Sequence, residues 1–416
     1  GAGSNTHGEQ REMMQKGAQS GRVVWALAPV LIIIALLVWK ARDDADSAAQ
    51  PLATQGAVAA TPPPAESKPV EGFGDKAQMA RKDKLKLLQA QLVEAQQRLD
   101  SYKATTKYPH ESRPISEHQD QIKPFAPISE DKPMRTQKGD AIPGQHLRTT
   151  QERVFVSGQE SVLFTVALVD DNNRPLPLRV SRAVAHETQG GNNINSYPPV
   201  AVQFEDRGAN GDAVAGDQIL SARFQPATQG FATLAGTIRI EVYLQGDAGP
   251  GQLFFDIIYS PLVPATWLGG AHEAMESGSL AFYLKANVKE AGRYVVNARA
   301  YDANGKPFAL LTFNDEVQAG AKEFRLPLFG KLVRDLKPAF PITLRDVEGF
   351  LLYENRFPDR AMMPRWPGVM HTSANYPLAA FSDAEWTSEE RSRYLNEFGK
   401  DVTQAETSIK ELEAKP

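Results

Sequence analysis

Hydrophobic and polar residues follow three patterns along this chain, and each pattern predicts a different kind of element. An uninterrupted apolar run fills residues 23–39. Two stretches, within 76–104 and 385–416, repeat apolar residues at helical spacing. Between them, from about Val154, apolar residues alternate with a period of two, which is typical of half-buried strands. The pattern predicts a mainly β protein with one transmembrane helix, one amphipathic or coiled-coil helix and a C-terminal helix.

The apolar run between Arg22 and Lys40 predicts a helix that crosses the lipid bilayer. It lies at the short end of the ~17–25 residues that a spanning helix needs. Trp25 and Trp39 mark its ends, where amphipathic rings favour the membrane interface. A cleaved signal peptide and a buried core helix are the alternatives. The run is too long for a signal peptide, and the residues around Trp39 form a poor cleavage site.

The residues around this run favour a cytoplasmic N-terminus. Three basic residues precede the run within 1–22, whereas Lys40 and Arg42 follow it, and positive charge tends to stay on the cytoplasmic side. Nearly all the sequence that can fold lies after the run. We therefore expect a cytoplasmic tail at 1–22, a span of the inner membrane at 23–39, and a body in the periplasm or another extracytoplasmic space.

The stalk that follows combines two linkers with a helix. An Ala- and Pro-rich linker is predicted over 40–75, and an amphipathic helix over 76–104. The apolar residues of this helix fall on one stripe: Leu85, Leu88, Leu92, Ala95, Leu99 and Tyr102. The stripe predicts either a short coiled coil that joins copies of the chain, or a helix that packs on the chain's own body. Six prolines within 105–150 predict a second, Pro-rich linker.

Two β-sandwich modules are predicted, over 151–263 and, with a closing segment, over 264–384. Alternation in the first is clearest at Val162, Phe164, Val166 and Leu168. The segment at 252–260 is apolar on both faces and predicts a central strand. Alternation in the second is clearest at Leu280, Phe282, Leu284, Ala286 and Val288.

The most distinctive local sequence is EDRGANGDAVAGDQILSARF, in the first module. It interleaves three glycines with side chains that offer oxygen ligands: Asp206, Asn210, Asp212 and Asp217. Hard oxygen ligands at short spacing, with glycines that allow tight turns, could surround Ca²⁺. Alternatively, the carboxylates accept hydrogen bonds from nearby backbone amides and shape the loop. The spacing does not fit an EF-hand loop.

This segment resembles the D-x-G-x-x-G-D-x-x-x-G-D loop of Ig-like modules in bacterial envelope and secreted proteins. The resemblance covers the segment well and the rest of the module only by strand pattern, and Gln218 stands where a glycine is expected. The second module resembles the same family through a G-x-Y strand that leads into a D-x-N-G turn: Gly292, Tyr294, Asp302, Asn304 and Gly305. The resemblance implies two Ig-like β-sandwiches and a bacterial, extracytoplasmic location.

The C-terminal residues 385–416 predict a second amphipathic helix, with Thr387 and Glu390 as its capping box. Its apolar stripe has the same spacing as the first: Leu395, Phe398, Val402, Ala405, Ile409 and Leu412. This helix either packs on the adjacent domain or docks a partner. The Met- and Arg-rich segment around Trp366 has the composition of an interface, and a buried loop is the alternative for it.

Composition and missing motifs limit the chemistry. The chain carries 46 basic and 50 acidic residues, for a net charge of −4, which argues against nucleic acid as a partner. It has no cysteine, so thiolate catalysis and Cys-ligated metals are excluded. The sequence contains no H-E-x-x-H, G-x-S-x-G or phosphate-loop motif. We therefore expect no enzymatic activity and no cofactor, with Ca²⁺ as the open alternative at the acidic loop.

Anchor, stalk and sandwich modules together predict a membrane-anchored structural or adaptor subunit that binds other envelope proteins. Its partners would be the lipid bilayer through 23–39, envelope proteins, and a second copy of the chain through the predicted helices. A receptor module for glycan or cell-wall polymer is the first alternative, and exposed aromatic residues clustered on one sandwich face would favour it. An enzyme with an unrecognised site is the second, and a deep polar pocket would favour that.

Overall fold

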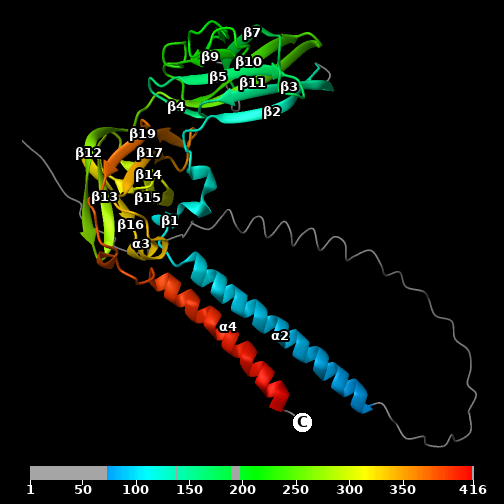
Figure 1. Cartoon of the computed structure of the whole chain (residues 1–416), viewed down its shortest axis with the longest axis vertical. Helices are drawn as coiled ribbons and strands as arrows, with labels where there is room; N and C mark the ends of the chain where they lie inside the picture. Colours follow the sequence, from blue (N-terminus) through cyan, green and yellow to red (C-terminus); the bar gives the residue numbers. More distant parts are fainter. Residues whose placement is uncertain (1–72, 137–138, 189–196, 415–416) are drawn as a thin grey trace, which may run out of the picture. The chain divides into compact units, whose positions relative to one another are not determined.

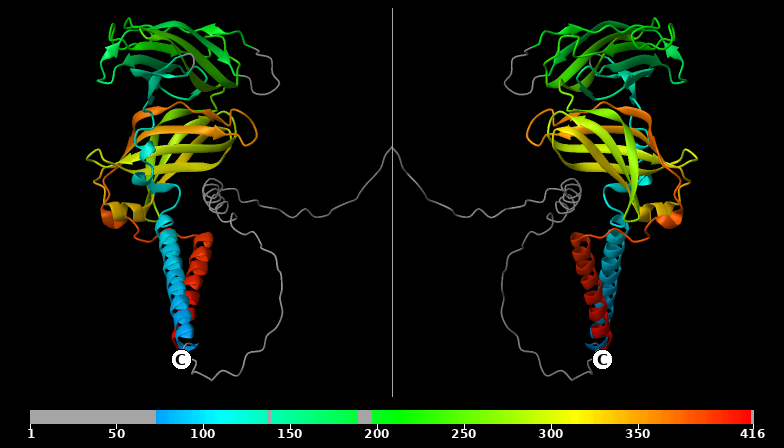
Figure 2. Two further views of the ribbon diagram at one scale, coloured as in Figure 1. Left: turned by 90° about the vertical axis from the view of Figure 1, so that its right-hand side faces the viewer. Right: turned by 90° about the vertical axis from the view of Figure 1, so that its left-hand side faces the viewer.

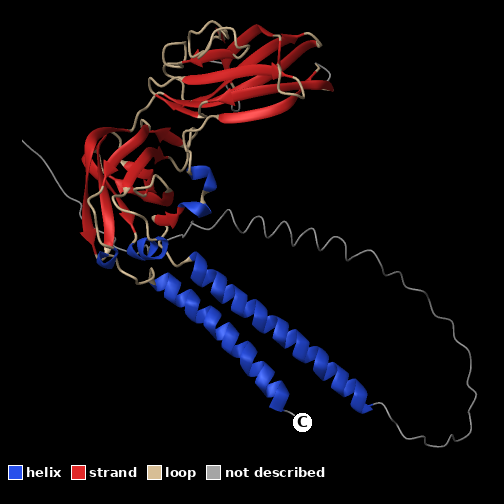
Figure 3. Ribbon diagram, viewed as in Figure 1, coloured by secondary structure: helices blue, strands red, loops and turns tan. Residues whose placement is uncertain are grey.

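The computed structural model describes residues 73–136, 139–188 and 197–414. This part of the chain is mainly β, as the sequence predicts, with several antiparallel sheets and three α-helices (Figures 1 and 3). The predicted tail at 1–22, the predicted span at 23–39 and nearly all of the predicted linker at 40–75 lie outside the described residues. Within the residues that are described, no helix combines the length and apolar character needed to cross a membrane.

The first sandwich consists of two sheets packed on one core. One sheet has the order β2-β3-β5-β6, with β9 also paired to β5: Ile128–Arg135, Ala141–Gln151, Val162–Val169, Pro175–Leu176 and Leu220–Phe224. The other has the order β4-β11-β10-β7-β8: Phe155–Ser157, Gly249–Ser260, Gly236–Gly246, Leu178–Glu187 and Val200–Ala201. Their inward side chains meet in a core that includes Phe164, Phe224, Ile238, Ile240 and Ile257. The period-two pattern therefore selects the buried faces of β5 and β10 correctly.

Residues 105–150 are not the linker that the prolines predict. They contain β2 and β3, which pair with each other, and β3 also pairs with β5 of the first sandwich. Pro133 is tolerated because β2 is an edge strand, where a missing N–H breaks no ladder bond on the solvent side. The inward Met134 at the end of β2 is fully buried. The first sandwich thus begins near Ile128 and not at residue 151.

The second sandwich is built from two separated parts of the chain. Its six-stranded sheet has the order β1-β15-β14-β17-β18, with β19 paired to β17: Ser112–Pro114, Pro307–Val317, Gly292–Tyr301, Thr343–Leu352, Arg360–Met362 and Trp366–Thr372. The facing sheet has the order β12-β13-β16: Ala265–Glu276, Ser279–Val288 and Gly320–Leu328. Because β1 precedes the first sandwich in sequence and pairs with β15, the first sandwich is an insertion within the second.

One turn of the second sandwich follows directly from its local sequence. The Asp302 carboxylate accepts the N–H groups of Asn304 and Lys306, each at 2.9 Å, and Gly305 has φ of +76°, so the predicted D-x-N-G turn is confirmed. Helix α3 spans Gly330–Leu336. Three 3₁₀ turns complete the regular structure of the described residues: Ile115–Glu117, Gln119–Gln121 and Leu378–Ala380.

Two long helices lie outside the sandwiches. Helix α2 spans Phe73–Thr105 and α4 spans Glu389–Ala414, and they run side by side in both views of Figure 2. Helix α2 begins three residues before the predicted 76–104. At the start of α4, the Ser388 hydroxyl accepts the N–H of Arg391 at 3.0 Å, so Ser388 is the N-cap in place of the predicted Thr387.

Candidate functional site

The acidic loop of the first sandwich is organised around Asp206. One carboxylate oxygen of Asp206 accepts the N–H of Gly216 at 2.5 Å and of Asp217 at 3.2 Å, and the other accepts the N–H of Gln218 at 2.9 Å. Gly216 and Gln218 have φ of +76° and +67°, which glycine adopts readily and Gln218 does not. The Asp206 carboxylate therefore holds a backbone turn that costs strain at Gln218.

Asp212 and Asp217 complete the loop, whereas Asn210 does not face them. Asp212 is 8% exposed, and its carboxylate accepts the Gly208 N–H at 2.5 Å. The Asp217 carboxylate accepts the Ile219 N–H at 2.9 Å. Asn210 instead donates from its amide to the Glu205 carboxylate. Three of the four predicted ligands are thus brought together.

The three carboxylates lie close enough to share one cation. Ligand oxygens of Asp206, Asp212 and Asp217 are all within 4.8 Å of one another. Four of their six oxygens already accept backbone N–H groups in the loop. The donor set suits Ca²⁺, which takes oxygen ligands from carboxylates and backbone carbonyls. Shaping of the loop by these carboxylates is therefore observed, and Ca²⁺ binding stays a prediction.

The two predicted stripes pack against each other. A buried cluster joins Ala95 and Leu99 of α2 to Val402 of α4, and Leu92, Leu395 and Phe398 pack around it. The Tyr102 ring lies 5.2 Å from that of Phe398 and 5.7 Å from that of Tyr394. The first stripe therefore finds its partner in the same chain, three hundred residues later in sequence, and each stripe explains why the other is apolar.

The tip of the helix pair is less completely packed. Leu85 and Leu88 of α2, and Ile409 and Leu412 of α4, are only partly buried and lie outside the buried cluster. The Arg81 guanidinium donates to the carbonyl of Leu412 at 3.0 Å and to that of Glu413 at 3.2 Å. This contact satisfies carbonyls that the end of α4 leaves unpaired.

Trp366 lies on β19 and packs, half-buried, against the core of the second sandwich. Its indole N–H donates to the Val369 carbonyl at 3.3 Å. The side chain is thus largely occupied within its own module, and the interface role of Trp366 stays a prediction.

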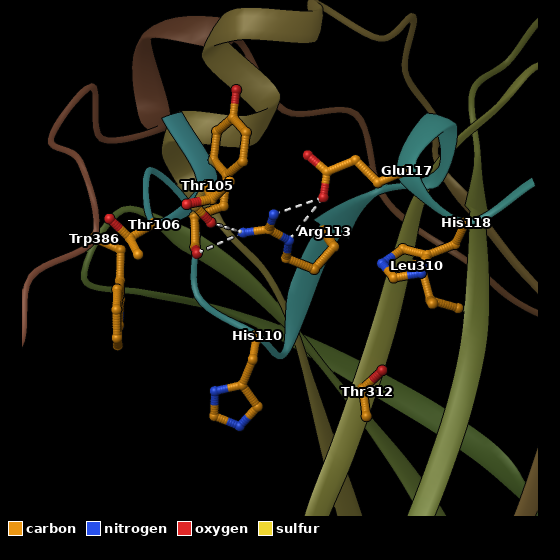
Figure 4. Close-up of a pocket in the computed structure, with 10 residues that line it drawn as sticks. Thr105, Thr106, His110, Arg113, Glu117, His118, Leu310, Thr312 and Trp386 are labelled. Carbon is orange, nitrogen blue, oxygen red and sulfur yellow. Dashed lines mark hydrogen bonds and ion pairs between the residues drawn. The ribbon is translucent and has the colours of Figure 1, made fainter. Parts of the chain in front are cut away.

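A pocket of about 530 Å³ lies where α2 joins the second sandwich (Figure 4). Its cationic group, Arg113, is fully engaged: it donates to the Glu117 carboxylate at 2.6 and 3.0 Å, and to the carbonyls of Thr105 and Tyr108 at 2.8 and 3.1 Å. His110 and Trp386 also line the pocket. Arg113 and its partners hold the end of α2 in place.

Next to this pocket, charged and polar groups join the residues that follow α2 to helix α3. Asp335 accepts from Lys107 at 2.7 Å, from the Tyr108 hydroxyl at 2.8 Å and from Lys331 at 3.0 Å. Burial acts to raise the pKa of Asp335, but these hydrogen bonds outweigh it and lower the pKa to about 2. Lys331 also pairs with Asp383 at 2.8 Å.

A larger groove of about 800 Å³ opens at one edge of the first sandwich, between β2 and β3 on one side and β11 on the other. Its apolar lining includes Leu147, Leu253 and Phe255, together with two strongly exposed side chains, Ile128 at 48% and Phe254 at 57%. The Arg239 guanidinium lies 4.0 Å from the Phe254 ring centroid and makes a bidentate pair with Asp256 at 2.7 and 2.8 Å. That pairing raises the pKa of Arg239.

The β11 backbone pairs with no strand along this groove. Among the described residues, β4 pairs only with positions 258–260 of β11, on the side opposite β10. The Ile258 N–H donates to the Val154 carbonyl there, and the Asp256 carbonyl accepts from the Gln151 side chain. Since backbone direction alternates, the N–H and C=O groups of Gln252 and Phe254 point to the same open side.

The other wall of the groove is protected against strand pairing. Glu130 and Lys132 of β2 line the groove and pair with each other at 2.6 Å, and Pro133 follows them. Charged side chains and proline are standard protection for an edge strand. The open edge available for pairing is therefore that of β11.

Sequence reasoning missed this groove because it treats 252–260 as a central strand. The structure does place β11 between β10 and β4, but β4 pairs only with positions 258–260 and leaves the β11 edge at 252–257 unpaired. The signal that could have revealed it is Phe254, since its outward position in the alternation should be polar on an ordinary solvent face.

The fold and these surfaces define a mainly β protein of two sandwiches with a helix pair. No protein-family model and no curated protein sequence matches the chain. Among solved structures it is similar to a DUF4785 family protein from Legionella pneumophila, with a TM-score of 0.38 and 11% identity over 55% of this chain and 57% of that one. It is also similar to trypsin-activated alpha-2-macroglobulin from Escherichia coli, with a TM-score of 0.20 and 11% identity over 57% of this chain and 17% of that one. These similarities are too distant to assign a family or a function.

Proposed function

We propose that this chain is a membrane-anchored, extracytoplasmic structural or adaptor subunit that binds protein partners in a bacterial envelope assembly. In this proposal residues 23–39 anchor it in the inner membrane, and both sandwiches are Ig-like modules. The observation that carries the proposal is the groove beside β11, because it combines an apolar lining with unpaired backbone groups of a strand.

An extended segment of a partner protein is the occupant that fits this groove best. Such a segment would pair its backbone with Gln252 and Phe254, and its alternate side chains would enter the apolar lining. Strand addition of this kind obtains affinity from main-chain hydrogen bonds and specificity from pockets for alternate side chains. Gln151 occupies the Asp256 carbonyl, so the added strand would end there.

The glycan-receptor alternative receives less support. The two strongly exposed phenylalanines among the described residues, Phe254 at 57% and Phe357 at 59%, come from different sandwiches. A carbohydrate site that uses aromatic faces needs them to converge on one ligand. A single phenylalanine beside an open strand edge suits a peptide better.

The experiment that tests the proposal places a photo-crosslinking amino acid at Gln252 in the full chain in its native membrane. We expect a specific crosslinked protein, with the crosslink in an extended segment, and loss of that product in Phe254→Glu. Arg179 is the control position, because it is exposed on β7, two strands away in the same sheet. Val214→Glu is the control substitution, since Val214 is 58% exposed in the same module. Equal crosslinking from Gln252 and Arg179 would contradict the proposal.

A further inference from the structure

The groove beside β11 lies where the core of the first sandwich is open at one edge. Leu147 and Leu253 line this groove and also pack, half-buried, against the core. Phe255, which is 6% exposed, belongs to the core and lines the groove as well. Strand β2 extends the opposite sheet across the groove, whereas the β11 edge that faces it, at 252–257, pairs with no strand. An occupant would therefore contact the core of the sandwich directly.

Two contacts show how β2 runs along β11. Ile128 of β2 pairs with Gln151 of β3, and the Gln151 side chain donates to the Asp256 carbonyl at 2.8 Å. At the other end of β2, the Met134 methyl group lies 2.9 Å from the position that a Cβ atom on Gly251 would take. Strand β2 therefore runs opposite in direction to β11, with Ile128 near Asp256 and Met134 near Gly251.

This alignment brings the charged side chains of β2 beside the open backbone groups of β11. Each strand advances by about 3.3 Å per residue, so Glu130 lies level with Phe254. Lys132, the next residue on the same face of β2, lies level with Gln252. Both charged residues line the groove, and their side chains pair with each other at 2.6 Å. The pair is satisfied within β2 and presents no net charge to an occupant.

A strand added beside β11 would point alternate side chains into the groove. The inward side chain beside Phe255 would meet Ile128, at the end where the added strand stops. The next inward side chain, beside Leu253, would lie between Glu130 and Lys132. The first position is therefore apolar, and the second is bounded by an ion pair with no net charge.

We propose, in an inference that rests on the proposed function, that the docked partner segment is a β-strand with uncharged side chains at both inward positions and an apolar one beside Phe255. A charged side chain beside Phe255 would enter the core without a partner, which is costly. A charged side chain beside Leu253 would compete for one member of the Glu130–Lys132 pair and leave the other unpaired. Valine and other β-branched residues suit the inward positions, because they favour strands.

Geometry selects a single partner strand over a second copy of this chain. The β11 edge of a second copy is faced by its own β2, so two such edges cannot pair without bringing two β2 strands into one groove. A single strand meets no such obstacle. It would cover both strongly exposed apolar side chains at the groove, Ile128 at 48% and Phe254 at 57%.

Two labelled peptides of equal composition test this selectivity on the full-length chain. In one, valine and lysine alternate, so that valine fills both inward positions. In the other, pairs of valines alternate with pairs of lysines, so that every register places a lysine at one inward position. We expect the wild-type chain to bind the alternating peptide about tenfold more tightly, as measured by fluorescence anisotropy, because the paired peptide brings a charge into the groove. Equal binding of the two peptides would overturn the proposal.

Substitutions in the groove provide the second readout, in which the ratio of the two affinities is measured because a change in overall charge alters both alike. Lys132→Glu leaves two carboxylates beside the second inward position, so we expect the ratio to shift about tenfold toward the paired peptide. Lys132 is 67% exposed, so its replacement should leave the fold intact. Ile128→Glu should weaken binding of the alternating peptide, whereas Val214→Glu should not, because Val214 is 58% exposed outside the groove. An unchanged ratio in Lys132→Glu would overturn the proposal.

Failure of this proposal and failure of the proposed function give different results. A partner segment that crosslinks to Gln252 but carries charged side chains at both inward positions would overturn the selectivity alone. A chain that selects the alternating peptide but crosslinks no partner from Gln252 would contradict the proposed function alone.

Discussion

At the scale of single residues, the acidic loop shows how one carboxylate can organise a turn. Asp206 accepts three backbone N–H groups that no strand or helix satisfies. Buried or half-buried donors without an acceptor are costly. The spacing of aspartates and glycines predicts a special loop, but it does not distinguish acceptors of backbone hydrogen bonds from ligands of a cation.

Replacing Asp206 by Ala removes the acceptor for all three N–H groups. We expect the free energy of unfolding to fall by about 1 kcal/mol, because the N–H of Asp217 is half-buried whereas water reaches those of Gly216 and Gln218. Denaturant unfolding in the presence of a chelator measures this cost, and repetition with millimolar Ca²⁺ separates the two roles of the loop. An equal loss in both conditions supports the loop-shaping role alone. A wild-type chain that gains stability with Ca²⁺, where Asp206→Ala does not, supports a cation site.

The Asp335 carboxylate, at the junction of α2 and α3, makes the free energy of unfolding depend on pH in the acid range. Its folded pKa of about 2 is below the ordinary value of 3.8, so the unfolded chain binds more protons at this group between these values. Its contribution is complete above about pH 4 and is lost as the pH falls toward 2. We expect Asp335→Asn to lower the free energy of unfolding by about 1 kcal/mol at pH 7. At pH 2, where most of the contribution of this carboxylate is lost, the same substitution should lower it by much less. Thermal unfolding across this range checks the prediction, and an Asp335→Asn effect that is the same at both pH values would contradict it.

At the scale of elements, the helix pair shows two amphipathic stripes that need each other. Neither helix has another apolar surface to cover its stripe fully, and most of the stability of such helices comes from packing. The spacing of leucines predicts both stripes correctly from the sequence. It does not predict that the stripes pair within one chain, because spacing gives a face and not its partner.

Leu99→Ala should loosen the helix pair without unfolding the sandwiches. The side chain is 9% exposed and packs with Ala95 and Val402, so its truncation is expected to cost about 2–3 kcal/mol. Hydrogen exchange should then quicken along α4 and stay unchanged in β13 and β14. Leu87→Ala is the control, because Leu87 is 60% exposed. Similar exchange in the two variants would mean that α2 does not protect α4.

At the scale of the whole molecule, the chain order of the sandwiches determines which fragments can fold. The first sandwich needs β2 and β3, which come before residue 151, and the second needs β1, which comes earlier still. A boundary drawn from strand pattern alone at residue 151 removes the strands that cover one edge of β5.

A fragment of residues 126–263 is therefore expected to fold, whereas 151–263 is not. Loss of β3 would expose the β5 edge and remove Leu147 from the core. Calorimetry should give one cooperative transition for the longer fragment and none for the shorter. Cooperative unfolding of 151–263 would show that β2 and β3 are dispensable.

The sequence alone determined the local features: the mainly β class, the faces of the strands, the two helical stripes and the D-x-N-G turn. Each depends on residues close together in the chain, whose periodicity or turn chemistry is read directly. Only the tertiary structure decided which surfaces meet. It brought β1 to β15, formed β2 and β3 within the predicted linker at 105–150, paired α2 with α4 and left part of one β11 edge unpaired beside a groove. These outcomes depend on contacts between residues far apart in sequence, and local patterns carry no information about such partners.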